Sequence, residues 1–185
     1  MFNFDEIYPR EGYHSVKYDL RESIFGEKDI IPMWVADMDF RTPGFILEAI
    51  RQRANHEILG YTLRSEKFFE SIVHWMQTKH QWTINKEWIS FSPGVVPALA
   101  MIVLAFTNPG DKIIVQPPVY FPFFDTVKNH GRQLVYNQLL NSANKYTFDF
   151  DGLKKLIDSR TRMILISNPH NPVGRVFNRS ELERL

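Results

Sequence analysis

From residue 89 onward, short apolar runs alternate with longer stretches of helical character, and this alternation constrains the fold more than any other feature of the chain. Short apolar runs bounded by turn residues are typical of buried strands, while the longer stretches are typical of helices. Strands that alternate with helices indicate a helix-covered sheet of parallel strands. We therefore expect strands at 89–91, 113–115, 134–136 and 163–166, with helices at 95–106, 121–130 and 151–158.

The first third of the chain has a different pattern. Residues 1–42 are mixed and rich in aromatic side chains, with one strand-like piece at 29–35, which indicates an arm or part of a second domain. Thr42 and Pro43 have the character of a helix cap and a first-turn proline. The apolar residues that follow them share one helical face, namely Ile46, Ala49, Ile50 and Ala54. A second helix is expected after Ser65, with a core-facing side made of Phe69, Ile72, Val73 and Met76.

The composition is that of a soluble globular protein, since 44% of the residues are hydrophobic and 23% are charged. A net charge of +1 argues against nucleic acid as the main partner. The chain contains no cysteine, which excludes thiol nucleophiles, disulfides and thiolate metal ligands. Its histidines show no spacing typical of metal binding, so we expect no metal.

Neither a membrane span nor a secretory signal is expected. The longest apolar run, 95–106, is shorter than the roughly 20 residues that a membrane-spanning helix needs. The first residues lack a basic stretch followed by an apolar core, which a secretory signal would have. We therefore expect a cytoplasmic location.

Three loops, each after an expected strand, carry residues suited to a planar, phosphorylated ligand. Residues 94–96 begin an apolar helix, where free backbone amides and the positive end of the helix favour a phosphate. Tyr120 lies among prolines and could stack on a flat ring. Asn171 offers a hydrogen-bond donor and an acceptor to a ring substituent. Ligands of such sheets lie outside the carboxyl ends of the strands, so we expect the loops to converge there.

At this point the chain resembles the fold-type I pyridoxal-phosphate enzymes of the class I/II aminotransferase superfamily, most closely the MalY/PatB-like cystathionine β-lyase branch. The resemblance spans almost the whole chain. The motifs that carry it are, in order, Trp-Val-Ala-Asp-Met-Asp-Phe at 34–40, Gly-Tyr-Thr at 60–62, Pro-Gly-Val-Val at 93–96 and Asn-Pro-His-Asn-Pro-Val-Gly at 168–174. It implies a three-layer α/β fold with helices on both faces of the sheet, of which this chain is the N-terminal half. Residues 1–42 would be an N-terminal arm or part of a small domain, and 43–185 an incomplete cofactor-binding large domain.

The resemblance implies pyridoxal 5′-phosphate as the cofactor and gives several residues a role toward it. The phosphate would be bound by the start of the helix, the ring would be stacked on an aromatic side chain, and the ring oxygen would be bound by an amide. The residues in these three roles are Gly94, Val95 and Val96, then Tyr120, then Asn171.

Two further roles follow from the same resemblance. Tyr61 would reach the phosphate of the partner subunit's cofactor, which implies a homodimer with shared active sites. The backbone of Ala36 would lie near the carboxylate of an amino-acid substrate.

Several of these residues also have a structural interpretation. Gly94 could be only a turn before the apolar helix, and Tyr61 could be an ordinary surface aromatic residue. Tyr120 could be a packing residue, and Asn171 could brace its own loop by bonding the backbone. Asp37 and Asp39 resemble a carboxylate pair for acid–base chemistry, but we interpret them as caps of the turn before Thr42. His170 is interpreted as structural.

No lysine of this chain matches the Schiff-base lysine of the family, which we expect beyond Leu185. The Ser-x-x-Lys spacing at 142–145 is interpreted as a turn. Asn178 and Glu181 resemble a capping box at a helix start. The favoured function is C–S β-lysis of cystathionine or cysteine conjugates to a thiol, pyruvate and ammonia. The alternatives are an aminotransferase or, if the chain ends at Leu185, an inactive fragment or interaction module.

Overall fold

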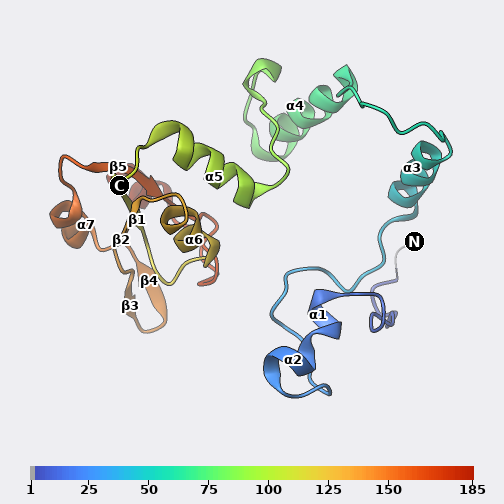
Figure 1. Ribbon diagram of the computed structural model, residues 1–185, viewed down its shortest axis with the longest axis horizontal. Helices are drawn as coiled ribbons and strands as arrows, with labels where there is room; N and C mark the ends of the chain where they lie inside the picture. The colour runs from blue at the N-terminus through green and yellow to red at the C-terminus, as the bar shows by residue number, and fades with distance from the viewer. Residues whose placement is uncertain (1–2) are drawn as a thin grey trace. The chain divides into compact units, whose positions relative to one another are not determined.

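The computed structural model describes residues 3–185 and divides into two compact units, Met1–Phe69 and Glu70–Leu185. The chain is drawn in Figure 1. Helix α4, Glu66–His80, begins close to the division and starts one residue after Ser65, as predicted. The expected core-facing side of α4 is its least exposed side, because Phe69, Ile72, Val73 and Met76 are half-buried. The proposed boundary at residue 42 stays a prediction.

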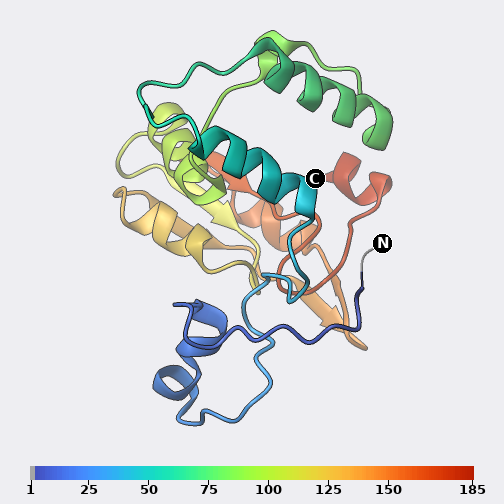
Figure 2. The ribbon, with the colours of Figure 1, turned by 90° about the vertical axis from the view of Figure 1, so that its right-hand side faces the viewer.

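The first unit contains two short helices and one longer helix. Helices α1, Val16–Asp19, and α2, Arg21–Phe25, follow one another directly, and they lie side by side in both views (Figures 1 and 2). Gly26 ends α2 with a φ of 74°, a left-handed conformation that glycine adopts without a steric penalty. The strand-like piece at 29–35 is irregular, so that prediction is wrong. Among the residues described it has no partner strand, and an isolated strand leaves its backbone groups unpaired.

Helix α3, Gly44–Ala54, starts one residue later than the sequence predicted. Pro43 is its N-cap residue, and no side chain caps the helix, so the prediction that Thr42 is the cap is wrong. The predicted apolar face does lie on one side of the helix, where it lines an open groove. The groove is formed by Phe45, Ile46, Ala49, Ile50, Arg53, Ala54 and Leu59.

The second unit is built on a parallel sheet whose strand order is β2-β1-β5. The strands are β1, Lys112–Val115, β2, Gln133–Tyr136, and β5, Thr161–Leu165. They confirm three of the four predicted strands. The fourth prediction, 89–91, is wrong: a short 3-10 helix at Lys86–Trp88 is followed by irregular backbone. Residues 89–91 are apolar, but in the described chain they pair with neither edge strand.

The order of the strands places helices on both faces of the sheet. The chain runs from β1 through α6, Pro122–Lys128, to β2 on one side, and then returns past β1 to β5 through α7, Phe150–Leu156. Parallel crossovers are right-handed, so reversing the direction moves the second helix to the other face. Figure 1 shows α5, Val95–Phe106, and α6 on one side of the sheet and α7 on the other. The three predicted helices of this unit and the α/β class are confirmed.

The core of the second unit has two parts. The larger part lies between β1 and the helices α5 and α6, with Val103, Ile113, Val115 and Val127 fully buried and Phe123 nearly so. The smaller part is made of Leu139, Phe148 and Phe177. It packs between the hairpin region and the chain that follows β5.

The hairpin of β3, Leu140–Ser142, and β4, Lys145–Thr147, confirms that residues 142–145 form a turn. Ala143 and Asn144 both have positive φ, 48° and 62°, as a two-residue hairpin turn requires. The hairpin is the orange pair of strands that extends away from the main sheet in Figure 2. The last helix, α8, Arg179–Arg184, begins with the predicted capping box. Glu181 N donates to Asn178 Oδ1 over 2.9 Å, and Asn178 N donates to Glu181 Oε2 over 2.9 Å.

Candidate functional site

Two of the predicted site loops leave neighbouring strands at the same edge of the sheet. Val115 ends β1 and is in register with Leu165, which ends β5. The chain leaves β1 toward β2 on one side, while β5 lies on the other side, so β1 and β5 flank the point where the strand order reverses. In open parallel sheets this is the place where ligands bind. Tyr120 and Asn171 lie on the two loops that begin here.

The loop after β1 ends at the first turn of α6. Phe123 N donates to Tyr120 O over 3.1 Å, which fixes the main chain of Tyr120 at the start of the helix. The side chain of Tyr120 is 37% exposed and tilts against Phe121, with 5.4 Å between the ring centroids. Enough of the ring is therefore exposed to stack on a ligand.

The loop after β5 is held by its own hydrogen bonds. His170 N donates to Arg175 O over 2.7 Å, and Gly174 N donates to His170 O over 2.8 Å. Asn168 Oδ1 accepts from Phe177 N over 3.0 Å. These bonds keep the loop in one shape without the side chain of Asn171.

Asn171 itself is exposed. Its backbone N donates to Ser167 Oγ over 3.1 Å. Within residues 3–185 its side-chain amide makes no hydrogen bond, so the loop-bracing interpretation has no bond to support it. Because the main chain of the loop is already fixed, binding of a ligand would need to order only the side chain of Asn171.

His170 is part of the brace. Its side chain is 2% exposed, and its ring meets the ring of Phe177 edge to face. Burial lowers the pKa of His170, so the imidazole is neutral near pH 7. This agrees with the structural interpretation of His170.

The start of α5 offers backbone donors next to the loop after β1. Gly94 is the N-cap residue, and no side chain within the described chain caps the helix. Ser92 Oγ donates to Gly94 O over 2.8 Å, so this hydroxyl does not occupy the amides of Val95 and Val96. Val96 and Phe121 line one groove together with Pro97. The start of α5 and the start of α6 therefore share one groove, while the convergence of residues 94–96, Tyr120 and Asn171 on one ligand stays a prediction.

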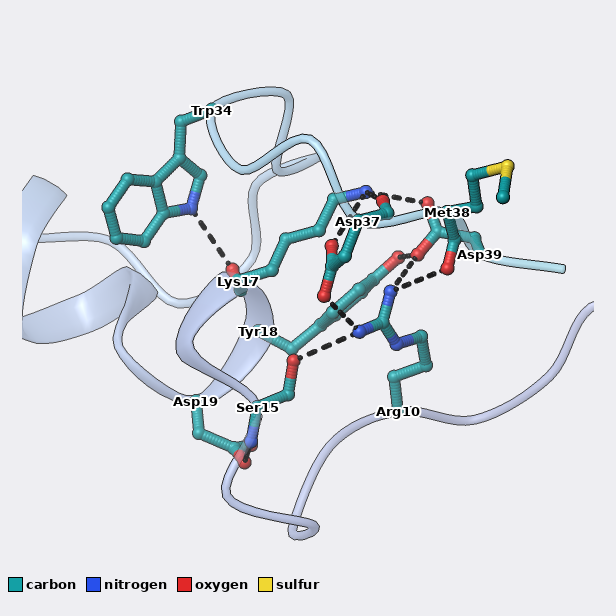
Figure 3. Close-up of polar contacts among 9 residues, drawn as sticks. All are labelled: Arg10, Ser15, Lys17, Tyr18, Asp19, Trp34, Asp37, Met38 and Asp39. Atoms are coloured by element: carbon teal, nitrogen blue, oxygen red, sulfur yellow. Dashed lines mark hydrogen bonds and ion pairs between the residues drawn. The ribbon is translucent and has the colours of Figure 1, made fainter. Parts of the chain in front are cut away.

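The other two predicted site residues belong to the first unit. Tyr61 is fully exposed, and Ala36 is exposed on an irregular segment. The residues after Ala36 are held by a cluster that sequence reasoning did not find, made of Arg10, Lys17, Asp37 and Asp39 (Figure 3). Its cations are about twenty or more positions from its carboxylates, so no local spacing indicated it.

The cluster corrects the interpretation of the two aspartates. Arg10 donates to Asp37 Oδ2 over 2.5 Å and to Asp39 Oδ1 over 2.6 Å, and Lys17 Nζ donates to Asp39 Oδ2 over 2.8 Å. The carboxylates thus do not cap the turn before Thr42. The hydrogen bond from Arg10 lowers the pKa of Asp37, and that from Lys17 lowers the pKa of Asp39 to about 2. Both remain ionised near pH 7 and are poor proton donors.

A pH titration of the aspartate carboxyl carbons by NMR is expected to give Asp39 an apparent pKa of about 2, below the ordinary 3.8. Because the folded value is the lower one, the ionised carboxylate stabilises the folded state above pH 3.8. That contribution is lost as the pH falls through about 2. In Lys17→Met the pKa should move back toward 3.8. An unchanged pKa in this variant would contradict the assignment of Lys17 as the main cause.

A family model for aminotransferase class I and II matches residues 28–185. The chain belongs to this family. It is 48% identical over 184 residues to cystathionine beta-lyase PatB of Bacillus subtilis (strain 168). The aligned region covers 99% of this chain and 48% of that protein. The chain thus spans about half the length of the curated relatives it matches.

Solved structures of the family have the same fold. A PLP-bound putative aminotransferase from Clostridium difficile 630 is 40% identical with a TM-score of 0.93, over 100% of this chain and 48% of that one. Cystalysin from Treponema denticola, whose crystal contains a pyridoxal 5′-phosphate cofactor, is 38% identical with a TM-score of 0.92, over 100% of this chain and 48% of that one. The resemblance and the fold class predicted from the motifs are confirmed.

Two structural observations concern a membrane and a metal ion, neither of which was expected from the sequence. Among the described residues no helix is long and apolar enough to cross a membrane. Within residues 3–185 no three acidic or histidine side chains gather as ligands for a metal ion.

Proposed function

We propose that the protein is a pyridoxal-phosphate-dependent C–S β-lyase that converts cystathionine or cysteine conjugates to a thiol, pyruvate and ammonia. The observation that supports the proposal is that the loops of Tyr120 and Asn171, with an exposed ring and an unbonded amide, leave the adjacent strands β1 and β5 where the strand order reverses. The similarity to a cystathionine β-lyase over 99% of the chain supports this particular reaction.

The donor set fits pyridoxal phosphate. The amides of Val95 and Val96, with Gly94 as a side-chain-free N-cap, would hold the phosphate at the positive end of a 12-residue helix. Tyr120 would cover one face of the ring, and the amide of Asn171 would donate to the ring oxygen. When bound, the cofactor supplies an electron sink for the carbanion formed at the substrate Cα. The residues of this chain orient the ring and the substrate, while the Schiff-base lysine is proposed to lie beyond Leu185.

The second candidate is an aminotransferase, which is favoured by the similarity to a putative aminotransferase from Clostridium difficile 630. Both reactions use all the residues proposed above. Release of pyruvate from cystathionine without an amino acceptor would identify the lyase, whereas a strict requirement for a keto acid would identify the aminotransferase. An inactive interaction module is not favoured, because the relatives are enzymes by name.

The proposal includes a cytoplasmic homodimer in which each subunit completes the site of the other. Tyr61 would reach the phosphate of the partner subunit's cofactor, and its complete exposure in this chain leaves it free to do so. The backbone of Ala36 would bind the substrate carboxylate. Residues 1–42 are proposed as an arm or part of a small domain, and 43–185 as part of the large domain.

Replacing Asn171 by alanine is expected to weaken binding of pyridoxal phosphate roughly 10- to 150-fold. A hydrogen bond to a charged oxygen contributes about 1.5–3 kcal/mol, and each 1.4 kcal/mol is tenfold. The dissociation constant is measured from the near-visible absorption of the intact protein at increasing cofactor concentration. The matched control is Asn108→Ala, an exposed asparagine that also precedes a proline and should leave the affinity unchanged. Equal affinities in the parent and in Asn171→Ala would contradict the role of Asn171 in binding the cofactor. A parent protein that stays colourless after cofactor addition would contradict the proposed function.

A further inference from the structure

A single lysine is bonded on both sides of the segment that carries Ala36. The main-chain carbonyl of Lys17 accepts from the indole Nε1 of Trp34 over 3.2 Å, on the N-terminal side of the segment. The Nζ of Lys17 donates to the main-chain carbonyl of Asp37 over 3.0 Å, on its C-terminal side. Figure 3 shows both bonds, and in the sequence Val35 and Ala36 lie between the two anchored residues.

The burial of Lys17 is unusual for its type. It is 6% exposed, although lysine is rarely buried unless it is paired. Its ammonium group reaches Asp39 Oδ2 over 2.8 Å as well as the carbonyl of Asp37, and the bond to Asp39 is the main cause that raises the pKa of Lys17. The lysine therefore remains charged near pH 7 and keeps both contacts.

Arg10 also holds the two carboxylates in place, since it donates to Asp37 Oδ2 and to Asp39 Oδ1. It also donates to Met38 O over 3.2 Å, and its guanidinium lies over the ring of Tyr18 at 5.1 Å from the centroid. Two cations thus face two carboxylates, and the cluster has no net charge. An anion near Ala36 would therefore be bound by peptide groups and not by the charge of this cluster.

The peptide groups between the anchors are free. Within residues 3–185 the main chains of Val35 and Ala36 make no hydrogen bond, whereas the indole of Trp34 before them and the main-chain carbonyl of Asp37 after them do. A short segment that is fixed at both ends and unbonded in the middle suits the recognition of a small anionic group, because little further ordering is needed on binding.

We propose that Lys17 is a positioning residue for the carboxylate of the amino-acid substrate. It holds the peptide groups of Val35 and Ala36 in place through Trp34 and Asp37 and does not itself touch the substrate. This inference rests on the proposed function and adds to it a side chain that positions the peptide groups for the carboxylate.

The test is Lys17→Met in the intact protein loaded with pyridoxal phosphate. Methionine keeps an unbranched side chain but cannot donate to Asp37 O or Asp39. Turnover is compared for an S-substituted cysteine and for its carboxamide, which lacks the carboxylate. We expect kcat/KM for the cysteine to fall roughly ten- to hundredfold, mostly through KM, as misplacing a binding group does. For the carboxamide it should change by less than about twofold, so the preference for the carboxylate falls about tenfold or more.

A second readout does not depend on turnover. The dissociation constant of an α-methyl amino acid, which has no Cα proton to lose, is followed from the cofactor absorption and should rise about tenfold or more in Lys17→Met. Cofactor affinity should not change. Lys28→Met is the control, since Lys28 is an exposed lysine of the same unit. Lys17→Arg, which retains a charged donor, should restore part of the preference.

The outcomes separate the two proposals. A parent protein that binds no cofactor and turns over no substrate defeats the proposed function. The positioning role alone is overturned if the parent is active and Lys17→Met keeps its preference for the carboxylate. It is also overturned if kcat/KM falls equally for the cysteine and for its carboxamide. If Lys17→Met does not fold, Trp34→Phe is used, since it removes the indole donor to Lys17 O and so breaks one of the two anchors. A preference unchanged in Trp34→Phe then overturns the positioning role.

Discussion

Replacing Phe177 by alanine is expected to lower the free energy of unfolding by about 3–5 kcal/mol, the usual range for losing a buried phenyl ring. The side chain is 2% exposed and stacks on Phe148 with 4.0 Å between the ring centroids. Together with Leu139 these rings form the smaller core of the second unit. The cavity would open beside the loop of Asn171, because the ring of Phe177 meets the ring of His170 edge to face.

Urea unfolding, followed by tryptophan fluorescence, measures this change. Phe177→Leu keeps most of the apolar volume and should lose less than about 1.5 kcal/mol. The alanine variant should also bind pyridoxal phosphate more weakly than its remaining stability explains, since the loop loses its support. A loss below about 1 kcal/mol in Phe177→Ala would contradict the packing described here.

Replacing Phe123 by alanine is expected to lower the free energy of unfolding by a similar amount, about 3–5 kcal/mol. Phe123 is 7% exposed and belongs to the larger core with Val115 and Val127. It lies in the first turn of α6, and its backbone N donates to Tyr120 O. The substitution should therefore loosen both α6 and the ring that we propose to stack on the cofactor.

The change is measured from the urea midpoint and from hydrogen exchange of the β1 amides, which should become faster. Phe121→Ala is the matched control because it removes the same ring two residues away, where it is 68% exposed. That variant loses only a partial contact with Tyr120 and should be destabilised by less than about 1.5 kcal/mol. If Phe121→Ala and Phe123→Ala were equally destabilised, burial of Phe123 in the core would not be what stabilises α6.

Elements with local signals could be predicted from the sequence. The apolar stretch of α5 has the predicted bounds, and strands β1, β2 and β5 are within two residues of theirs. The capping box of Asn178 and Glu181 closes a ring between residues three positions apart, so the sequence contains all of its parts. These features depend on neighbours along the chain, whose spacing is fixed by the covalent backbone.

Elements that need a distant partner could not be predicted in this way. Residues 89–91 have the composition of a strand, yet in the described chain no neighbouring strand pairs with them. Thr42 has the side chain of a helix cap, but α3 begins at Gly44 with Pro43 as its N-cap residue. The roles of Asp37 and Asp39 depend on Arg10 and Lys17, which the fold of the first unit brings to them.

By itself the sequence determined the alternation of strands and helices, the loops that carry Tyr120 and Asn171, and the motifs that place the chain in its family. These are properties of residue type and local spacing, which persist wherever the segments lie. Only the tertiary structure decided that β1 and β5 are neighbours, that Phe177 supports the Asn171 loop, and that Lys17 is bonded on both sides of Ala36. The contacts behind these features join different segments of a unit, so their free energy is gained only when that unit folds.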